Sequence, residues 1–158
     1  MVPDHMNRSR ISSGTADKDG WFTAKVRYVY LRSGRLNQTL QFVPPATKVW
    51  KKKVEWAIED SGRHARVEYT LDGPKGRLSR RLAVGQDTRD VRETRVEAES
   101  QTRSGVISVQ VRLDGPKIQI FNDKGNLLDE YTPADFDLSK TQIRIRTEAQ
   151  FVVRSNNE

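Results

Sequence analysis

The chain has 158 residues and carries 28 Lys and Arg against 21 Asp and Glu, which gives a net charge of +7. This length is enough for a sizeable core, and we predict one domain over residues 21–153. The absence of cysteine excludes disulfides and thiolate zinc sites. No apolar run approaches the roughly 18 residues of a membrane helix. These features predict no particular cellular compartment.

Both ends of the chain are predicted to lie outside the folded domain. Residues 1–20 are mostly polar and carry too little apolar surface to offset the entropy of ordering them, so we expect a disordered tail. The pair His5-Met6 is what a common cloning junction leaves, which puts residues 1–6 in question as native sequence. We expect residues 154–158 to be frayed.

Between these ends, apolar and polar residues alternate, which is typical of strands with one buried and one wet face. Short turn motifs such as Ser33-Gly34 and Ser104-Gly105 separate the alternating runs. The pattern predicts an all-β fold, an antiparallel β-sandwich of jelly-roll or lectin-like type, with a β-barrel as the alternative. The expected strands cover residues 22–30, 36–43, 65–71, 78–84, 92–98, 107–113, 117–121, 127–131, 143–146 and 150–153.

One segment, residues 47–59, is compatible with two structures. Thr47 could cap a short helix whose apolar stripe begins at Trp50. The rival is a strand with Val54, Trp56 and Ile58 on one face, which would pair with the similar run that begins at His64. We prefer the strand because the hairpin would join two alternating segments.

A nine-residue pattern occurs twice, as VEYTLDGPK at residues 67–75 and VQVRLDGPK at residues 109–117. Each copy is a strand that runs into an Asp-Gly-Pro turn. Proline keeps the preceding residue out of the helical region, so Gly73 and Gly115 should be extended or in a conformation that suits glycine. Gly76 ends the first turn, whereas Ile118 stands in the second copy, so the turns need not share one geometry. Duplication of a hairpin and convergent turn chemistry both remain open.

No motif predicts catalysis, a metal site or a cofactor. His5 and His64 cannot build a multi-histidine site, and no Gly-rich phosphate loop is present. Glu55 and Glu59 would share one face of a strand about 13 Å apart, too far for the carboxylate pair of a retaining glycosidase.

Positive charge is the stronger functional signal, because cations recur on the polar sides of the predicted strands. Basic residues mixed with aromatic residues are typical of sites for single-stranded nucleic acid or sugars. The alternative interpretation involves no ligand: the tryptophans belong to the core, and the arginines on the polar faces keep the protein soluble. The candidate ligand-binding residues are Lys25, Arg27, Arg66, Arg112, Arg144, Arg146, Trp50, Lys51, Lys52, Lys53 and Trp56.

The run VQVRLDGPKIQI, residues 109–120, resembles the strand, Asp-Gly turn and strand unit of concanavalin-like and laminin-G-like sandwich modules. It covers about a twelfth of the chain. The resemblance implies a lectin-type jelly roll and a glycan ligand. No binding residue of those families matches position by position.

We therefore predict a non-catalytic binding or interaction module whose ligand is a glycan or another anionic polymer. The alternatives are a nucleic-acid-binding domain of low sequence specificity, which would act by charge and shape, and a structural or assembly subunit that forms an oligomer. An enzyme is the least favoured class.

Overall fold

The computed structural model describes residues 10–11, 16–23, 36–43, 53–60, 62–96, 106–134, 136, 141–147 and 150–155. Twelve strands occupy most of this part of the chain, and it contains no helix that is long and apolar enough to cross a membrane. The strands are β1 (Arg10–Ile11), β2 (Phe22–Thr23), β3 (Leu36–Val43), β4 (Lys53–Asp60), β5 (Ala65–Asp72), β6 (Arg77–Val84), β7 (Asp87–Arg95), β8 (Ile107–Asp114), β9 (Lys117–Phe121), β10 (Leu127–Tyr131), β11 (Thr141–Thr147) and β12 (Gln150–Ser155).

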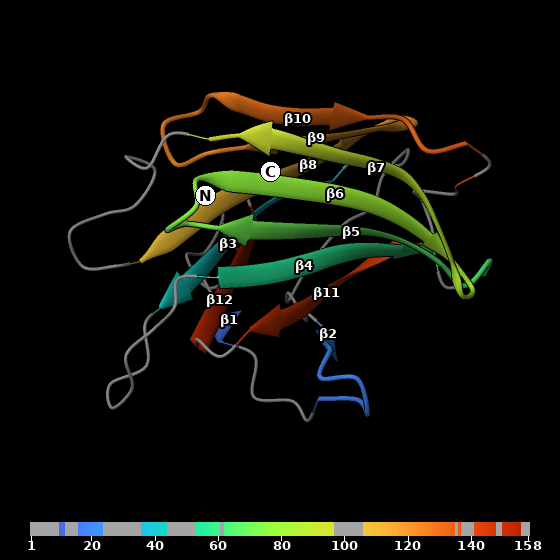
Figure 1. Ribbon diagram of the computed structural model, residues 1–158. Helices are drawn as coiled ribbons and strands as arrows, with labels where there is room; N and C mark the ends of the chain where they lie inside the picture. The colour runs from blue at the N-terminus through green and yellow to red at the C-terminus, as the bar shows by residue number, and fades with distance from the viewer. Residues whose placement is uncertain are drawn as a thin grey trace, which may run out of the picture.

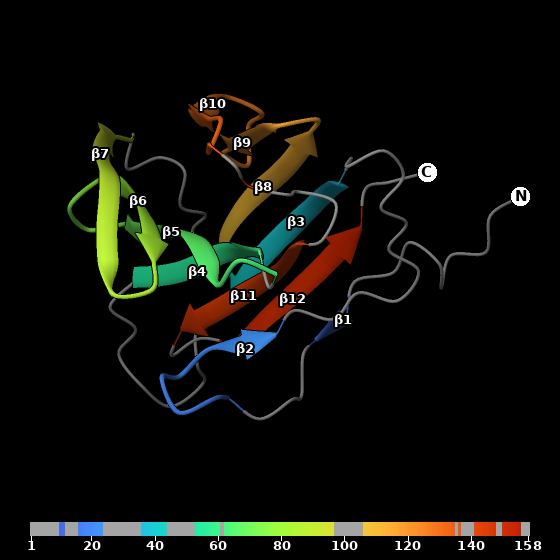
Figure 2. The same ribbon diagram turned by 90° about the vertical axis from the view of Figure 1, so that its right-hand side faces the viewer.

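The strands form two six-stranded antiparallel sheets that pack face to face (Figure 1). Sheet A has the order β1-β12-β3-β8-β9-β10, and sheet B has the order β2-β11-β4-β5-β6-β7. Figure 2 shows β7 and β10 at one margin of the sandwich and β1 and β2 at the other. The predicted all-β sandwich is confirmed, and the barrel alternative is wrong because the strands belong to two separate sheets.

Alternating apolar residues from both sheets fill the space between them. On β5 every second residue is buried, and on β4 Val54, Trp56 and Ile58 face the same core as Val67 and Tyr69 of β5. The rings of Trp56 and Tyr69 stack with centroids 5.5 Å apart, as expected for neighbours on adjacent strands. Burial of such a set supplies most of the stability of a two-layer domain.

A polar cluster crosses between the sheets at the β6–β7 and β10 margin. Arg80 of β6 is buried and donates to the carboxylate of Asp129 on β10, with Arg92 of β7 also 3.5 Å from that carboxylate. Tyr131 of β10 donates from its hydroxyl to Asp90 of β7 at 2.7 Å. These contacts bridge the sheets at a margin where the apolar core ends.

The two copies of the repeated pattern turn differently. In the second copy, Asp114 of β8 pairs directly with Lys117 of β9, so the loop has two residues, Gly115 and Pro116. Gly115 has a φ of +61°. Positive φ at the first loop position followed by proline is the arrangement of a type II′ turn. In the first copy the loop has four residues between Asp72 and Arg77, and the positive φ belongs to Gly76. The expectation of a special conformation is therefore confirmed for Gly115, whereas Gly73 has no positive φ.

Several boundaries differ from those predicted by pattern. The strand expected at residues 92–98 begins at Asp87, because Gly85 and Gln86 form a two-residue hairpin loop directly after Val84. The strand preferred at residues 54–59 is confirmed as β4, Lys53–Asp60, while residues 44–52 lie outside the described part. Parts of the predicted tails have defined structure, since β1 pairs with β12 and β12 continues to Ser155.

Candidate functional site

The outer face of sheet B gathers charged side chains from four neighbouring strands, β11, β4, β5 and β6. The alternation that buries Trp56 and Ile58 turns Glu55 and Glu59 away from the core. The strand register then places Glu55 opposite Arg146 of β11, and Glu59 opposite Arg66 of β5. Opposite charges are thus adjacent on the same face of the sheet.

Glu59 lies at the centre of this arrangement and is shared among three donors. Arg144 Nη1 donates to Glu59 Oε2 at 3.3 Å, and Gln142 Nε2 donates to the same oxygen at 3.1 Å. Arg66 Nη2 lies 3.6 Å from the other oxygen, Oε1. With both oxygens engaged, the Glu59 carboxylate has little freedom to rotate.

The same pairing continues on both sides of Glu59. Glu68 of β5 lies 3.7 Å from Arg66 Nη1 and accepts a hydrogen bond from Arg81 Nε on β6. Arg146 donates from Nε to Glu55. Four carboxylates therefore face four guanidinium groups, and this surface has no net charge; its members are Asp17, Glu55, Glu59, Glu68, Arg66, Arg81, Arg144 and Arg146. We call these eight residues the ion-pair face.

The turn that precedes β2 covers the middle of the ion-pair face. Arg144 Nη2 donates to Asp17 Oδ2, and the other carboxylate oxygen accepts from the backbone amides of Asp19 and Trp21, each at 2.9 Å. The pKa of Asp17 is lowered, chiefly by the hydrogen bond from the Trp21 amide, with smaller contributions from the Asp19 amide and Arg144, against a burial effect in the opposite direction. The Asp17 carboxylate thus fixes the turn on the sheet.

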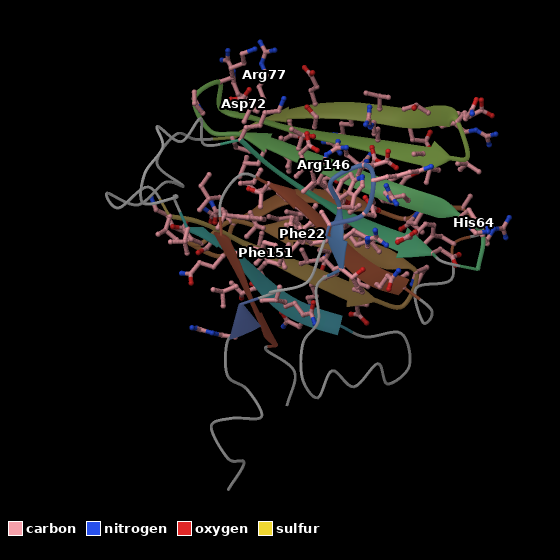
Figure 3. All side chains as sticks on the ribbon, turned by 90° about the horizontal axis from the view of Figure 1, so that it is seen from below. Phe22, His64, Asp72, Arg77, Arg146 and Phe151 are labelled. Atoms are coloured by element: carbon pink, nitrogen blue, oxygen red, sulfur yellow. The ribbon has the colours of Figure 1, made fainter. Side chains whose placement is uncertain are left out.

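Trp21 packs between cations on this outer face and is 2% exposed. The guanidinium carbons of Arg146 and Arg66 lie 4.4 and 4.9 Å from the centroid of its ring. Figure 3 shows Arg146 over the middle of the sheet, with Asp72 and Arg77 at one end of the strands and His64 at the other. Trp21 therefore holds two arginines in place and presents little ring surface of its own to a ligand.

The part of this outer face that remains accessible to a ligand is a flat surface of hydrogen-bond donors and acceptors held in fixed positions. The Arg81 side chain is 51% exposed although its Nε is held by Glu68, so its remaining N–H groups can reach solvent. Thr70 and Ser79 lie in the neighbouring row of the same face, opposite each other on β5 and β6. Such a surface suits a neutral, hydroxyl-rich ligand because each hydroxyl both donates and accepts.

The structure brings together three of the predicted site residues and separates a fourth. Arg66, Arg144 and Arg146 belong to the ion-pair face, whereas Arg112 is exposed on β8 of sheet A, opposite Asn37 and Gln119. The three sheet B arginines share one face as neighbours, and each is paired with a carboxylate.

The aromatic part of the prediction needs a correction. Trp56 is fully buried against Tyr69 and Phe42, since the strand alternation places it on the inner side, and it cannot contact a ligand at the surface. Lys53 is exposed at the start of β4. The other candidates lie outside the described residues: Lys25, Arg27, Trp50, Lys51 and Lys52.

Sequence reasoning missed Trp21 and the structural role of the acidic residues. Glu55 and Glu59 were weighed as catalytic carboxylates, and their shared face is confirmed, but each is held by arginine. The available signal is the even spacing of both pairs: Arg144 and Arg146 are two residues apart and Glu55 and Glu59 four, so each pair lies on one face of its strand. Among the described residues, no group of three or more His, Cys, Asp and Glu could hold a metal ion.

No family model and no curated protein matches the sequence. Solved structures match the fold at low identity. Galectin LEC-6 of Caenorhabditis elegans has a TM-score of 0.62 and 9% identity, with 90% of this chain and 100% of that chain covered. The carbohydrate binding module CBM66 from Bacillus subtilis has a TM-score of 0.50 and 9% identity, over 76% of this chain and 70% of that chain.

A third match is part of an enzyme. The fructofuranosidase from Schwanniomyces occidentalis has a TM-score of 0.58 and 11% identity, over 99% of this chain but 35% of that chain. This chain therefore spans about a third of that enzyme. Together the matches establish that the chain has a β-sandwich fold of the galectin or lectin-like type.

Proposed function

We propose that the protein is a non-catalytic glycan-binding module and that a neutral sugar binds on the ion-pair face of sheet B. The observation that carries this proposal is the charge balance of a dense polar surface, in which four carboxylates hold four guanidinium groups. The ion pairs fix each side chain before a ligand arrives. Preorganised donors and acceptors lose less entropy on binding.

The fold supports a glycan as the ligand class. Two of the similar structures are named as a galectin and as a carbohydrate binding module. The enzyme match is partial: the protein named for fructofuranosidase is matched over 35% of its own chain. No arrangement of catalytic groups among the described residues favours an enzyme, so binding alone is the simpler role.

The balance of charge also separates this proposal from nucleic-acid binding. A polyanion binds mainly through cations that are free to replace its counterions. On the ion-pair face the cations are already paired, and a bound polyanion would have to displace Glu59 and Glu68. A neutral glycan needs no such exchange.

A glycan array and a salt titration test the proposal. Arg81→Ala removes exposed donors, and Arg112→Ala removes an exposed arginine from sheet A as the matched control. We expect the dissociation constant for a neutral oligosaccharide to rise about tenfold in Arg81→Ala, which corresponds to about 1.4 kcal/mol, and to stay unchanged in Arg112→Ala.

The affinity of the unchanged protein should vary by less than about twofold between low and high salt, because a neutral ligand releases no counterions. Binding that weakens steeply with salt, equal loss in the two variants, or no signal from any neutral glycan would contradict the proposal.

A further inference from the structure

One end of the outer face of sheet B differs from the ion-pair face in its charge. The strand register aligns Lys53, Asp72, Arg77 and Arg95 in a single row across β4, β5, β6 and β7. Lys53, Arg77 and Arg95 are exposed, and Lys75 is exposed in the turn beside them. Figure 3 places Arg77 and Asp72 at this end. We call Lys53, Lys75, Arg77 and Arg95 the cationic end.

The cations of this end have no carboxylate partner among the described residues. Asp72 is the single acidic residue of the row, and its Oδ1 accepts the backbone amide of Lys75 at 3.2 Å. Arg77 stands directly opposite Arg95 on the neighbouring strand. Like charges in that position repel and destabilise a sheet. An anion bound between the two guanidinium groups would remove this repulsion.

The cationic end adjoins the ion-pair face. Arg77 and Arg95 are two residues along their strands from Ser79 and Glu93, which belong to the next row of the same face. Arg81, the member of the ion-pair face on β6, is four residues from Arg77 and so roughly 13 Å along the strand, a distance that two or three sugar units can bridge. A ligand could therefore contact the ion-pair face with its hydroxyls and the cationic end with one charged group.

We propose that the cationic end is a subsite for an anionic substituent, a sulfate or a carboxylate, carried by the glycan that binds the ion-pair face. This inference rests on the proposed function. Guanidinium groups suit both anions because their planar N–H groups donate to two oxygens at once. The ligand class becomes a glycan with an uncharged part and a single acidic group at one end.

A nucleic-acid backbone or an anionic membrane would offer similar charge, but the surroundings favour an isolated anion. Glu93 is exposed in the next row, and none of the described residues pairs with it. A chain of phosphates that ran on from the cationic end would meet this carboxylate and those of the ion-pair face. A ligand with one anionic group avoids the repulsion.

The test uses an array on which each neutral oligosaccharide has a singly sulfated counterpart of the same sequence. The variant is Arg77→Ala with Arg95→Ala. The matched control is Arg89→Ala, which removes an exposed arginine elsewhere on β7. At low salt we expect the protein to bind the sulfated form of one pair at least tenfold more tightly, and the double variant to bind both forms equally. The control should keep the preference.

The outcomes distinguish a failure of the anionic subsite from a failure of the proposed glycan-binding function. Equal binding of neutral and sulfated forms by the unchanged protein, or a preference that survives in the double variant, overturns the subsite and leaves the neutral site standing. Absence of binding to every glycan overturns the proposed function and the subsite with it. Tighter binding to single-stranded DNA or to vesicles with anionic lipid than to any sulfated glycan also overturns the subsite. The melting temperature of the double variant, expected to be unchanged or higher, confirms that it is folded.

Discussion

Arg80 of β6 donates from Nη1 to both carboxylate oxygens of Asp129 on β10, at 2.8 and 2.7 Å, and thereby links the two sheets. The Arg80 guanidinium also lies 4.0 Å from the centroid of the Tyr131 ring. Both charged side chains are almost fully buried, 10% and 2% exposed. The pair is therefore the most deeply buried polar contact of the cluster that joins the two sheets at this margin.

Replacing Asp129 should be far more damaging than replacing its exposed neighbour. Asp129→Ala leaves the buried Arg80 charge without its partner, and we expect the free energy of unfolding to fall by roughly 3 to 5 kcal/mol. Glu130→Ala removes an exposed carboxylate that pairs with Lys117 in solvent, and its loss of unfolding free energy should be far smaller. Denaturant unfolding of both variants checks this; equal losses would show that the cross-sheet pair carries no special weight.

Tyr131 should make stability fall in alkaline solution. Burial first, and then the hydrogen bond to Asp90, raise its pKa to about 12 from 10.0. Because the folded state keeps the phenol proton more tightly, the stabilisation is complete below pH 10 and is lost between pH 10 and 12.

Absorbance of the phenolate, followed in the folded protein and in Tyr131→Phe, measures the ionisation directly. We expect the difference between the two to appear near pH 12 and the fall in unfolding free energy to be shallower in Tyr131→Phe. A Tyr131 ionisation at the ordinary value near pH 10 would show that its environment has no effect.

The two LDGPK turns should respond unequally to alanine. Gly76 and Gly115 both have a φ of +61°, where any residue with a Cβ is strained. A Cβ on Gly115 would have nothing within 4 Å, whereas one on Gly76 would stand 2.9 Å from the Val96 carbonyl oxygen. Gly115→Ala should thus cost roughly 1 to 2 kcal/mol from strain alone, and Gly76→Ala clearly more. Equal denaturant midpoints for the two variants would contradict this reading of the turns.

The alternation of apolar residues was enough to predict most strands, because a half-buried strand leaves a period of two. Leu36–Val43, Lys117–Phe121 and Leu127–Tyr131 have the predicted bounds. The apolar alternation did not predict the bounds of Asp87–Arg95, because this edge strand is charged on both faces and has no apolar period. Charged side chains on a strand at a sheet margin prevent its exposed edge from pairing with another chain.

The candidate site was only partly predictable for a different reason. Arg66, Arg144 and Arg146 were recognisable as outward-facing, since their neighbours in sequence are apolar. Whether they are free or paired depends on the register between β11, β4 and β5, which sets Glu55 and Glu59 beside them. Register is a long-range property, and so is the position of Trp21 over the sheet.

Mapping of a bound glycan onto the backbone is the most direct measurement of the central claim. The neutral oligosaccharide with the strongest array signal is titrated into the isotope-labelled protein at high salt, and the amide chemical shifts are followed by NMR. We expect saturable shifts at Arg66, Glu68, Thr70, Ser79 and Arg81 on the outer face of sheet B, with Arg112 on sheet A unaffected. Shifts centred on Arg112 and the outer face of sheet A, with β5 and β6 unchanged, would contradict the assignment of the glycan site to the ion-pair face.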